Sequence, residues 1–283
     1  MKIGVDLGGT NIRAGLINDN TIVNMNSSLL NNKDNLESTL EQLKSLIHSV
    51  RDTTITGIGI GVPSVVDLEN GIVHDVVNIP SWKEVPLRDI LEKEFNVPVY
   101  INNDVNCFVL GEKYFGVGKN HKTFVGVALG TGIGSGILID NTLFNGVNCG
   151  SGEIGYLPYL EHDFEYYCSS NFFEKIHKTS GSQVYLEAKQ HDEKAIRLWE
   201  EFGHHIGMAL KSVVYAYDPE AIILGGSIST AFPFFKEQME LALKDTYFPK
   251  SMEKLKIYVS ELKHVAMLGA AALVDQYQEI GIG

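Results

Sequence analysis

The sequence feature that most constrains the fold is a glycine-rich turn between two short apolar strands, and it occurs twice. The first copy lies in residues 1–18, MKIGVDLGGTNIRAGLIN, where Ile3 and Val5 alternate with small or polar neighbours before Gly8-Gly9. This alternation, which resumes after the turn, predicts a strand on each side of it. A P-loop or dinucleotide-binding loop would open into a helix instead. We therefore expect a glycine-rich hairpin at the start of the chain.

The second copy lies in residues 124–141, FVGVALGTGIGSGILIDN, and repeats the order of strand, turn and strand. Either copy alone would read equally well as an ordinary hairpin with a glycine turn. An internal repeat indicates two similar domains. Two such turns on facing domains can hold one polyphosphate, because glycine lets phosphate oxygens approach the backbone N–H groups.

The turns supply the predicted phosphate contacts. The first offers backbone N–H groups at Gly8 and Gly9 and side-chain donors at Thr10 and Asn11. The second offers the corresponding groups of Gly130, Thr131 and Gly132. Asp6, at the end of the first strand, is placed to hold Mg²⁺ directly or through water.

Composition narrows the class of protein. The chain has 283 residues, is 44% apolar and carries a net charge of −12, which disfavours a nucleic-acid-binding surface. Three cysteines, at positions 107, 149 and 168, fit a reducing compartment and no disulfide framework. No apolar run is long enough to predict a membrane span, and the first strand begins at residue 2 without a preceding signal peptide. We expect a cytoplasmic protein with no nucleic-acid or membrane partner.

Hydrophobic periodicity predicts the alternating elements of an α/β protein. Residues 66–85 and 157–167 show no clear period, and the first of these is expected to be an irregular connection. Strands are expected at residues 2–7, 21–27, 55–61, 98–102, 123–129, 133–140, 220–224 and 255–259. Helices are expected at residues 35–50, from Pro86 to Phe95, from Asp104 to Gly111, and at 169–177, 192–217, 231–243 and 266–278.

Asn103 and Asp104 come at the end of a predicted strand and directly before a predicted helix. Ligands of α/β sheets bind at the carboxyl ends of strands, where Asp104 could act as a general base toward a hydroxyl group. The competing interpretation, which the sequence alone favours, is a helix N-cap. One carboxylate has two oxygens, so both roles can hold together.

Two further groups have weaker signals. Gly225-Gly226-Ser227 follows an apolar strand and could bring the backbone against an adenine or a ribose, or it could be a simple strand–helix turn. Cys149, His162, Cys168 and His177 match no zinc spacing, so packing roles are expected for them.

Taken in order, these motifs resemble those of the ROK family of sugar kinases, over nearly the whole chain. The segments are DLGGTNIRAGL (6–16), GVPSVVD (61–67), NIPSW (78–82), INNDVNCFVLGE (101–112), LGTGIGSGIL (129–138), GEIGY (152–156) and LGGSIS (224–229). The resemblance implies an α/β protein of two actin-like (ribonuclease H-like) domains, each with a five-stranded sheet, and a cleft between them. We place the first domain at residues 1–114, with the terminal helix 266–283 packing back on it, and the second at residues 115–265.

The resemblance also implies roles for single residues. Asp104 is implied as the catalytic base and Asp6 as the carboxylate on the Mg²⁺ side. The nucleotide is implied to contact Gly8, Gly9, Thr10, Asn11, Gly130, Thr131, Gly132, Gly225 and Gly226. The sugar is implied to contact Ser64, Asn78, Asn103, Asp104, Glu153, Tyr156 and Glu174.

One segment departs from the family pattern. Most members follow Glu-Ile-Gly with His and then with a Cys-x-Cys-Gly-x-x-Gly-Cys run, which together bind a structural zinc. Here Tyr156 replaces the His, and residues 165–174, EYYCSSNFFE, hold one cysteine, Cys168. We expect no zinc. Aromatic side chains are expected to pack in its place: Tyr166, Tyr167, Phe172 and Phe173.

The sequence therefore predicts ATP- and Mg²⁺-dependent phosphorylation of a hexose hydroxyl, with glucose favoured and O6 as the acceptor. Because the lost His would touch the sugar, N-acetylglucosamine, N-acetylmannosamine, mannose and fructose stay open. A sugar-responsive repressor would need an N-terminal DNA-binding domain. A sugar sensor without kinase activity would not need Asp6, Asp104 and both hairpins intact. Since family members are commonly dimers, a homodimer is expected.

Overall fold

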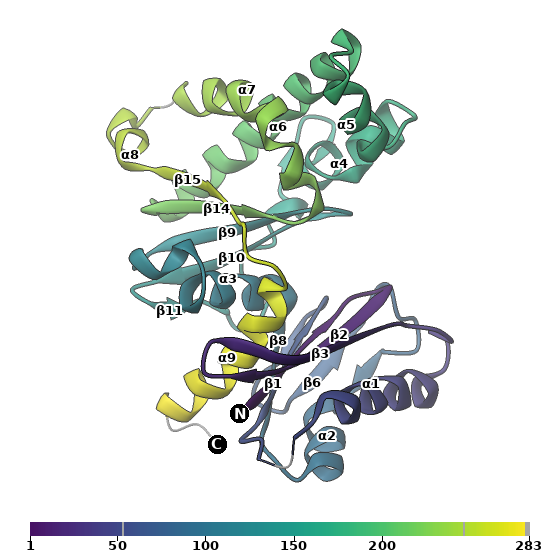
Figure 1. Cartoon of the computed structure of the whole chain (residues 1–283). Coiled ribbons are helices and arrows are strands. Elements are labelled where there is room, and N and C mark those ends of the chain that lie inside the picture. The colour runs from purple at the N-terminus through teal and green to yellow at the C-terminus, as the bar shows by residue number, and fades with distance from the viewer. Residues whose placement is uncertain (53, 246, 281–283) are drawn as a thin grey trace. The chain divides into compact units, whose positions relative to one another are not determined.

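The computed structural model describes residues 1–52, 54–245 and 247–280, without the side chains of residues 278–280 (Figure 1). The chain forms two compact units. The first comprises Met1–Asn120, Leu143–Ser151 and the C-terminal segment from Glu261, and the second comprises His121–Thr142 and Gly152–Ser260. Each unit is built around its own five-stranded sheet.

The sheet of the first unit has the order β3-β2-β1-β4-β8. The antiparallel meander of β1 (Lys2–Leu7), β2 (Asn11–Asn18) and β3 (Thr21–Leu29) contains the first glycine hairpin. Strands β4 (Ile58–Val62) and β8 (Val99–Asn103) continue the sheet in parallel with β1. The parallel strands end at the same edge of the sheet, which is where Asn103 and Asp104 lie.

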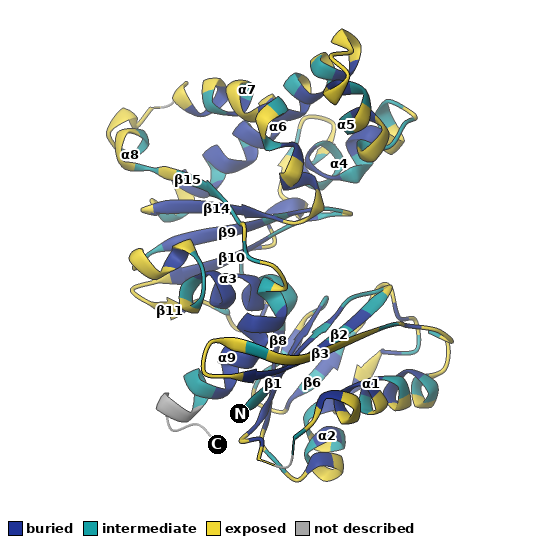
Figure 2. Ribbon diagram, in the orientation of Figure 1, coloured by how far each residue is buried: buried dark blue, intermediate teal, exposed yellow. Residues whose placement is uncertain are grey.

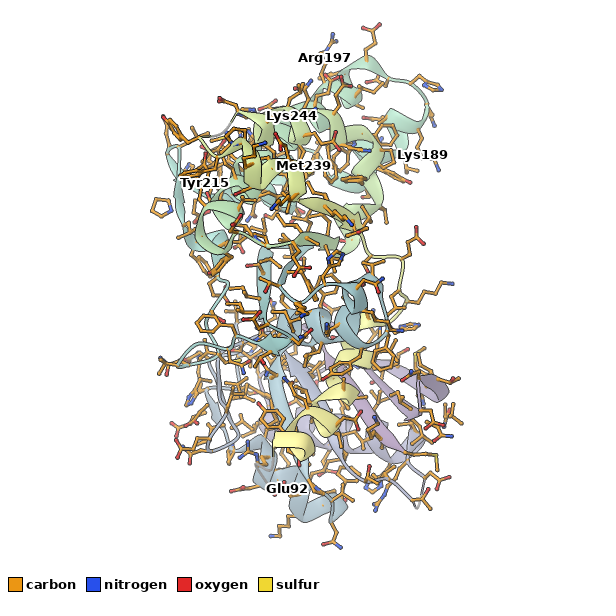
Figure 3. The ribbon with its side chains drawn as sticks, turned by 90° about the vertical axis from the view of Figure 1, so that its left-hand side faces the viewer. Glu92, Lys189, Arg197, Tyr215, Met239 and Lys244 are labelled. Atoms are coloured by element: carbon orange, nitrogen blue, oxygen red, sulfur yellow. The ribbon has the colours of Figure 1, made fainter. Side chains whose placement is uncertain are left out.

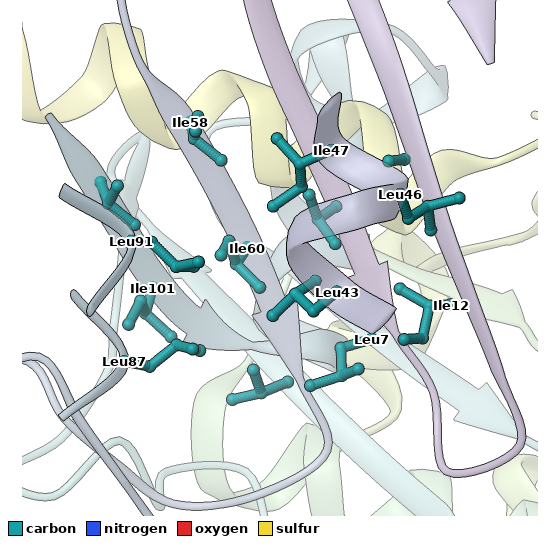
Figure 4. Close-up of a cluster of buried hydrophobic side chains, with 14 of the residues drawn as sticks. Leu7, Ile12, Leu43, Leu46, Ile47, Ile58, Ile60, Leu87, Leu91 and Ile101 are labelled. Carbon is teal, nitrogen blue, oxygen red and sulfur yellow. The ribbon is translucent and has the colours of Figure 1, made fainter. Parts of the chain in front are cut away.

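Helices cover both faces of this sheet (Figure 1). Helices α1 (Leu36–Val50) and α2 (Leu87–Phe95) contribute to the core on one face. On the other face α9 (Val265–Ile280) packs on β1 so closely that a Cβ at Gly4 would lie 2.0 Å from the carbonyl oxygen of Met267. Figure 4 shows the buried side chains of the first face, among them Leu7, Ile12, Leu43, Ile47, Ile58, Ile60, Leu87 and Ile101.

The segment at residues 66–85 is more regular than the sequence indicates. It forms a small three-stranded antiparallel sheet from β5 (Val66–Asp67), β6 (Ile72–His74) and β7 (Glu84–Val85). Strands of two or three residues are too short to show a period in the sequence, so the prediction of an irregular connection was wrong here.

The sheet of the second unit has the order β11-β10-β9-β14-β15, which repeats the order of the first sheet strand for strand. Its strands are β9 (Phe124–Leu129), β10 (Ile133–Ile139), β11 (Thr142–Leu143), β14 (Ala221–Gly225) and β15 (Lys256–Val259). The hairpin of β9 and β10 corresponds to that of β1 and β2. The predicted internal duplication is therefore confirmed.

The long helix α6 (Glu193–Tyr217) contributes one side of its surface to the hydrophobic core of the second unit. It packs against α7 (Phe232–Lys244) at close range, since a Cβ at Gly203 would lie 2.4 Å from the carbonyl oxygen of Phe235. Figure 2 shows the buried inner side of α6, and Figure 3 shows Lys189 and Arg197, which are exposed, at the outside of this unit. Within the described residues, no helix is both long and apolar enough to cross a membrane.

The remaining elements are short. The helices that the sequence prediction missed include α5 (Gly181–Lys189) and α8 (Pro249–Lys254). The predicted helix at 169–177 is a π-helical turn, η3 (Phe172–Ile176). The others are α3 (Asp104–Tyr114), η1 (Val117–Asn120), η2 (Ile154–Tyr156), β12 (Pro158–Tyr159), β13 (His162–Asp163), α4 (Phe164–Cys168) and η4 (Ser227–Ala231).

The aromatic residues expected in the altered zinc segment do pack together. The ring centroids of Phe172 and Phe173 are 5.0 Å apart, and those of Tyr166 and Tyr167 are 5.2 Å apart. The imidazole of His205 joins the two pairs, because it lies 5.1 Å from the Tyr167 ring and 5.8 Å from the Phe172 ring. Apolar burial thus holds this segment to α6.

Candidate functional site

Asp104 is the first residue of α3, at the end of β8. The N-cap of this helix is Asn103, whose Oδ1 accepts hydrogen bonds from the backbone N–H groups of Val105 (2.8 Å) and Asn106 (3.3 Å). The cap interpretation of Asp104 was therefore wrong. Asp104 Oδ1 accepts a hydrogen bond from the Val105 N–H at 2.9 Å, within the first turn of α3.

The start of α3 lies close to β4 and to the loop that follows it. A Cβ at Gly61 would be in van der Waals contact with Asp104 Cα at 3.4 Å, so β4 passes directly beside the first turn of α3. The amide of Asn103 donates to the carbonyl oxygen of Ser64 at 3.4 Å, and the Ser64 hydroxyl donates to the carbonyl oxygen of His74. Three predicted sugar contacts, Ser64, Asn103 and Asp104, are thus brought together.

The first hairpin lies against Asn78. The turn is closed by a 2.9 Å hydrogen bond from the Gly8 N–H to the carbonyl oxygen of Asn11. A Cβ at Gly9 would lie 2.4 Å from Asn78 Cβ, so only glycine fits there. Thr10, at the tip, is exposed. The structure therefore places one predicted sugar contact directly beside the predicted phosphate loop.

Asp6 forms an ion pair with Arg13, whose Nη1 lies 3.0 Å from Asp6 Oδ2. Burial raises the pKa of the Asp6 carboxyl, and the nearby Arg13 charge opposes that rise. No group of three or more His, Cys, Asp and Glu side chains among the described residues could hold a metal. Mg²⁺ in phosphoryl-transfer sites is held by one or two carboxylates, with water and substrate phosphate as the other ligands. A single carboxylate at Asp6 fits that requirement.

The second hairpin borders a pocket of about 410 Å³ that lies wholly in the second unit. The Gly130 carbonyl accepts a 2.9 Å hydrogen bond from the Ser170 N–H, which ties the turn to the segment before η3. None of the described residues that line the pocket is a lysine or arginine, and hydroxyl groups dominate its polar surface. Its lining residues are Gly130, Thr131, Ser170, Glu174, Ser180, Gly181, Ser182, Tyr185, Trp199, Ser227, Ile228, Thr230 and Ala231.

Gly226 gives this pocket its shape. Its φ is +83°, a conformation that L side chains rarely adopt, and a Cβ there would lie 2.2 Å from the carbonyl oxygen of Leu129. The chain therefore passes directly over the end of β9 before η4 supplies Ser227 and Ile228 to the pocket wall. Gly226 acts through this close approach, and neither Gly225 nor Gly226 is among the described residues that line the pocket.

A second group of predicted residues lies on the other side of the hairpin turn. Burial raises the pKa of the Glu153 carboxyl, and so does the nearby charge of Glu165. The charge of Glu165, ahead of burial, raises the pKa of the Tyr156 hydroxyl. A Cβ at Gly132 would lie 2.4 Å from Glu165 Oε2. Glu153, Tyr156, Glu165 and the second hairpin are therefore neighbours.

Sequence reasoning missed Glu165. It was read as part of the altered zinc run, and no spacing marks it, because the β12–β13 hairpin that brings it back consists of two-residue strands. Glu174, which the resemblance implied as a sugar contact, lines the 410 Å³ pocket, whose lining includes neither Glu153 nor Tyr156. The sugar contact of Glu174 stays a prediction, and the structure groups that side chain with the pocket.

Comparison with known proteins gives a consistent picture. The model of the ROK family matches residues 2–277. A glucokinase of Thermotoga maritima is 29% identical over 310 residues, which cover 97% of each chain. A xylose repressor of Bacillus spizizenii is 28% identical and covers 98% of this chain, but the match spans 77% of the repressor. The crystal structure of a ROK family glucokinase from Streptomyces griseus, in complex with glucose and AMPPNP, superposes with a TM-score of 0.83 at 23% identity, over 97% of this chain and 99% of that chain.

Proposed function

Because the chain belongs to the ROK family, we propose that it is a sugar kinase that transfers the γ-phosphoryl group of ATP to a hexose hydroxyl, with glucose as the favoured sugar and O6 as the acceptor. The observation that carries the proposal is the duplicated glycine hairpin. One copy belongs to the same sheet as β8, the strand that leads to Asp104. The other copy borders a hydroxyl-lined pocket of about 410 Å³. Similarity to a glucokinase over 97% of the chain supports it. A homodimer and a cytoplasmic location are expected with it.

In this mechanism Asp104 accepts the proton of the sugar hydroxyl while that oxygen attacks the γ-phosphorus. The carboxylate is oriented by the Val105 N–H, which leaves its position fixed relative to α3. Asn103 and Ser64, beside it, would hold neighbouring sugar hydroxyls. Glu153, with Glu165 beside it, would accept hydrogen bonds from sugar hydroxyls, and positioning of this kind would account for much of the rate enhancement.

The nucleotide would occupy the pocket of the second unit, with adenine and ribose against the η4 and α5 walls. Each hairpin would offer backbone N–H groups to phosphate oxygens, and in the second unit these donors would compensate for the lack of lysine and arginine among the described residues that line the pocket. When bound, Mg²⁺ neutralises phosphate charge, and Asp6 would be its protein ligand.

A coupled ADP-release assay on a panel of sugars tests the proposal. We expect turnover that requires both ATP and Mg²⁺, with the highest kcat/KM for glucose and a product phosphorylated at O6. The panel includes mannose, fructose, N-acetylglucosamine and N-acetylmannosamine. Turnover on an N-acetylhexosamine alone, or on fructose alone, would support the proposed kinase activity and would show that glucose is not its substrate. Tyr156, which is 65% exposed, stands where most family members have a His, and it makes those sugars the main alternatives.

The alternative of another class is a sugar-sensing regulator without kinase activity. Its support is the similarity to a xylose repressor over 98% of this chain. Calorimetric sugar binding without ADP release from any member of the panel would favour the regulator. This chain has the features that the kinase mechanism uses: the Asp6 carboxylate in its pair with Arg13, Asp104 at the start of α3, and both hairpins. Their presence favours the kinase.

A further inference from the structure

The segment from Leu143 to Ser151 belongs to the first unit, although the chain on both sides of it belongs to the second. Two of its side chains, those of Asn145 and Cys149, contact the strand β8 that leads to Asp104. Cys149 is buried and Asn145 is half-buried. The contacts are polar and join segments that are distant in the sequence, and most of them involve the amide of Asn102.

The oxygen of the Asn102 amide accepts three hydrogen bonds. The donors are the Cys149 thiol (3.1 Å), the Asn106 amide (2.9 Å) and the Asn103 backbone N–H (2.8 Å). The other end of the same amide donates to Asn145 Oδ1 at 3.0 Å. Asn102 has no exposed surface, so water cannot replace a missing partner at low cost.

These contacts fix the residues that carry the reaction. Asn102 precedes Asn103, the cap of α3, and Asn103 precedes Asp104. The Asn103 N–H and the Asn106 amide converge on the same oxygen, so the end of β8 and the first turn of α3 are held together. A shift of Asn102 would therefore move the peptide that sets the direction of Asp104.

Cys149 has an unfavourable backbone conformation. Its φ is +55°, a left-handed conformation in which the Cβ of a non-glycine residue is crowded by the backbone. Glycine would remove that crowding and would also remove the thiol. Strained residues of this kind persist where the surrounding structure holds them, often near functional sites. A glycine would lose the hydrogen bond from the thiol to Asn102 and the one that the thiol accepts from the Asn106 amide at 3.6 Å.

We propose that Cys149 and Asn145 are positioning residues that hold Asp104 in its catalytic orientation through Asn102. The proposal rests on the proposed function, because it takes Asp104 as the base. If these contacts only held the 143–151 segment in place, their loss would lower the free energy of unfolding and would not change kcat through Asp104. Kinetic measurements can therefore separate the two roles.

Two matched pairs of variants test this role. Cys149→Ala removes the donor, while Cys149→Ser keeps an O–H donor on the same backbone. Asn145→Ala removes the acceptor, while Asn145→Asp keeps one. We expect about a tenfold loss of kcat for each alanine variant, in line with the cost of small displacements at reacting groups. The KM for ATP should stay within about twofold, and the serine and aspartate variants should recover most of kcat.

The decisive comparison places Cys149→Ala in an Asp104→Asn background. If Cys149 acts through Asp104, it should cause little further loss there, because residues that act as a unit are not additive. An equal loss in both backgrounds, or identical kcat values for the alanine, serine and unsubstituted proteins, would overturn the proposal.

Alkylation gives a readout that does not depend on activity. Iodoacetamide should modify Cys149 slowly in the unsubstituted protein and faster in Asn145→Ala, with the site identified by mass spectrometry. An unsubstituted protein that phosphorylates no sugar would overturn the proposed function and the positioning role with it. Unchanged alkylation together with normal turnover would overturn the positioning role alone.

Discussion

Arg13 and Asp6 face each other across the first hairpin, with Nη1 and Oδ2 3.0 Å apart and the two residues in register between β1 and β2. The Asp6 side chain is 20% exposed and that of Arg13 is 40% exposed. Burial raises the pKa of Asp6, so the folded chain holds a carboxylate where its charged form is disfavoured. A cost of this kind is expected where the charge serves a function.

Asp6→Asn tests that interpretation. Because the folded pKa is raised, Asp6 contributes stability below its unfolded pKa, and this contribution is lost as the pH rises through the folded value. At pH 7 the variant should therefore unfold in guanidinium with a free energy equal to or above that of the parent, while kcat falls about 10²-fold. A variant that is less stable and fully active would contradict a functional role for this carboxylate.

Glu165→Gln and Glu174→Gln form a matched pair. The position of Glu165 beside Glu153 predicts that Glu165→Gln raises the KM for sugar about tenfold and leaves the KM for ATP unchanged. Glu174 lines the 410 Å³ pocket, so Glu174→Gln should change the KM for ATP instead. Steady-state kinetics with each substrate varied in turn measures both effects. The reverse pattern would restore Glu174 as the sugar contact.

The pKa values of this acidic group predict a pH dependence. Burial raises the pKa of both Glu153 and Glu165, and the charge of Glu165 raises that of Glu153 further. Sugar affinity that depends on ionised acceptors should therefore weaken on acidification at a higher pH than ordinary carboxyl groups would require. In Glu165→Gln the neighbouring charge is absent, so the remaining transition should move to lower pH. A profile of sugar affinity against pH that is identical in both proteins would contradict this coupling.

His205 predicts an acid-sensitive stability. Burial, together with the nearby His204 and His177 charges, lowers its pKa from 6.5 to about 4, and the Tyr159 hydroxyl lies 3.0 Å from its Nδ1. Neutral His205 favours the folded state, so its contribution is complete above pH 6.5 and is lost as the pH falls toward 4. The slope is at most about 1.4 kcal/mol per pH unit for one proton. Unfolding free energies of His205→Gln should therefore depend less steeply on pH between 6 and 5, and parallel slopes would contradict the assignment.

Much of the fold was accessible from the sequence, because long apolar strands and the helix at 193–217 have clear periods. The duplicated hairpin was found because both copies keep the same order of strand, turn and strand. The small sheet at 66–85 was not found, because its strands are too short to show a period. Asn103 took the cap role that Asp104 had been assigned, since both residues are good caps and only geometry separates them.

Less of the candidate site than of the fold could be predicted from the sequence. The approach of Gly9 to Asn78 and of Gly132 to Glu165 depends on how distant segments pack, and nothing in local spacing reports it. The contact of Asn102 with Cys149 is of the same kind, because it joins β8 to a loop that follows the second hairpin. Sequence motifs identified the residue types, and long-range packing determined which of them became neighbours.

Trp199 provides a direct report on the pocket. It lines the pocket, and its buried indole N–H has no hydrogen-bond acceptor among the residues that the structure describes. The other tryptophan, Trp82, is buried in the first unit and donates to Thr39 Oγ1 at 2.7 Å. In Trp82→Phe, ATP should change the remaining fluorescence in a saturable manner. Trp199→Phe should show no such change, and a response carried entirely by Trp82 would contradict the placement of the nucleotide.

The most direct test of the account is the turnover of Asp104→Asn, measured together with its affinity for the sugar. We expect calorimetry to give a sugar Kd within about threefold of the parent, while kcat for ATP-dependent phosphorylation falls by about 10² or more, as the loss of a general base requires. Unchanged turnover in this variant would remove Asp104 from the chemistry and would contradict the mechanism proposed for this chain.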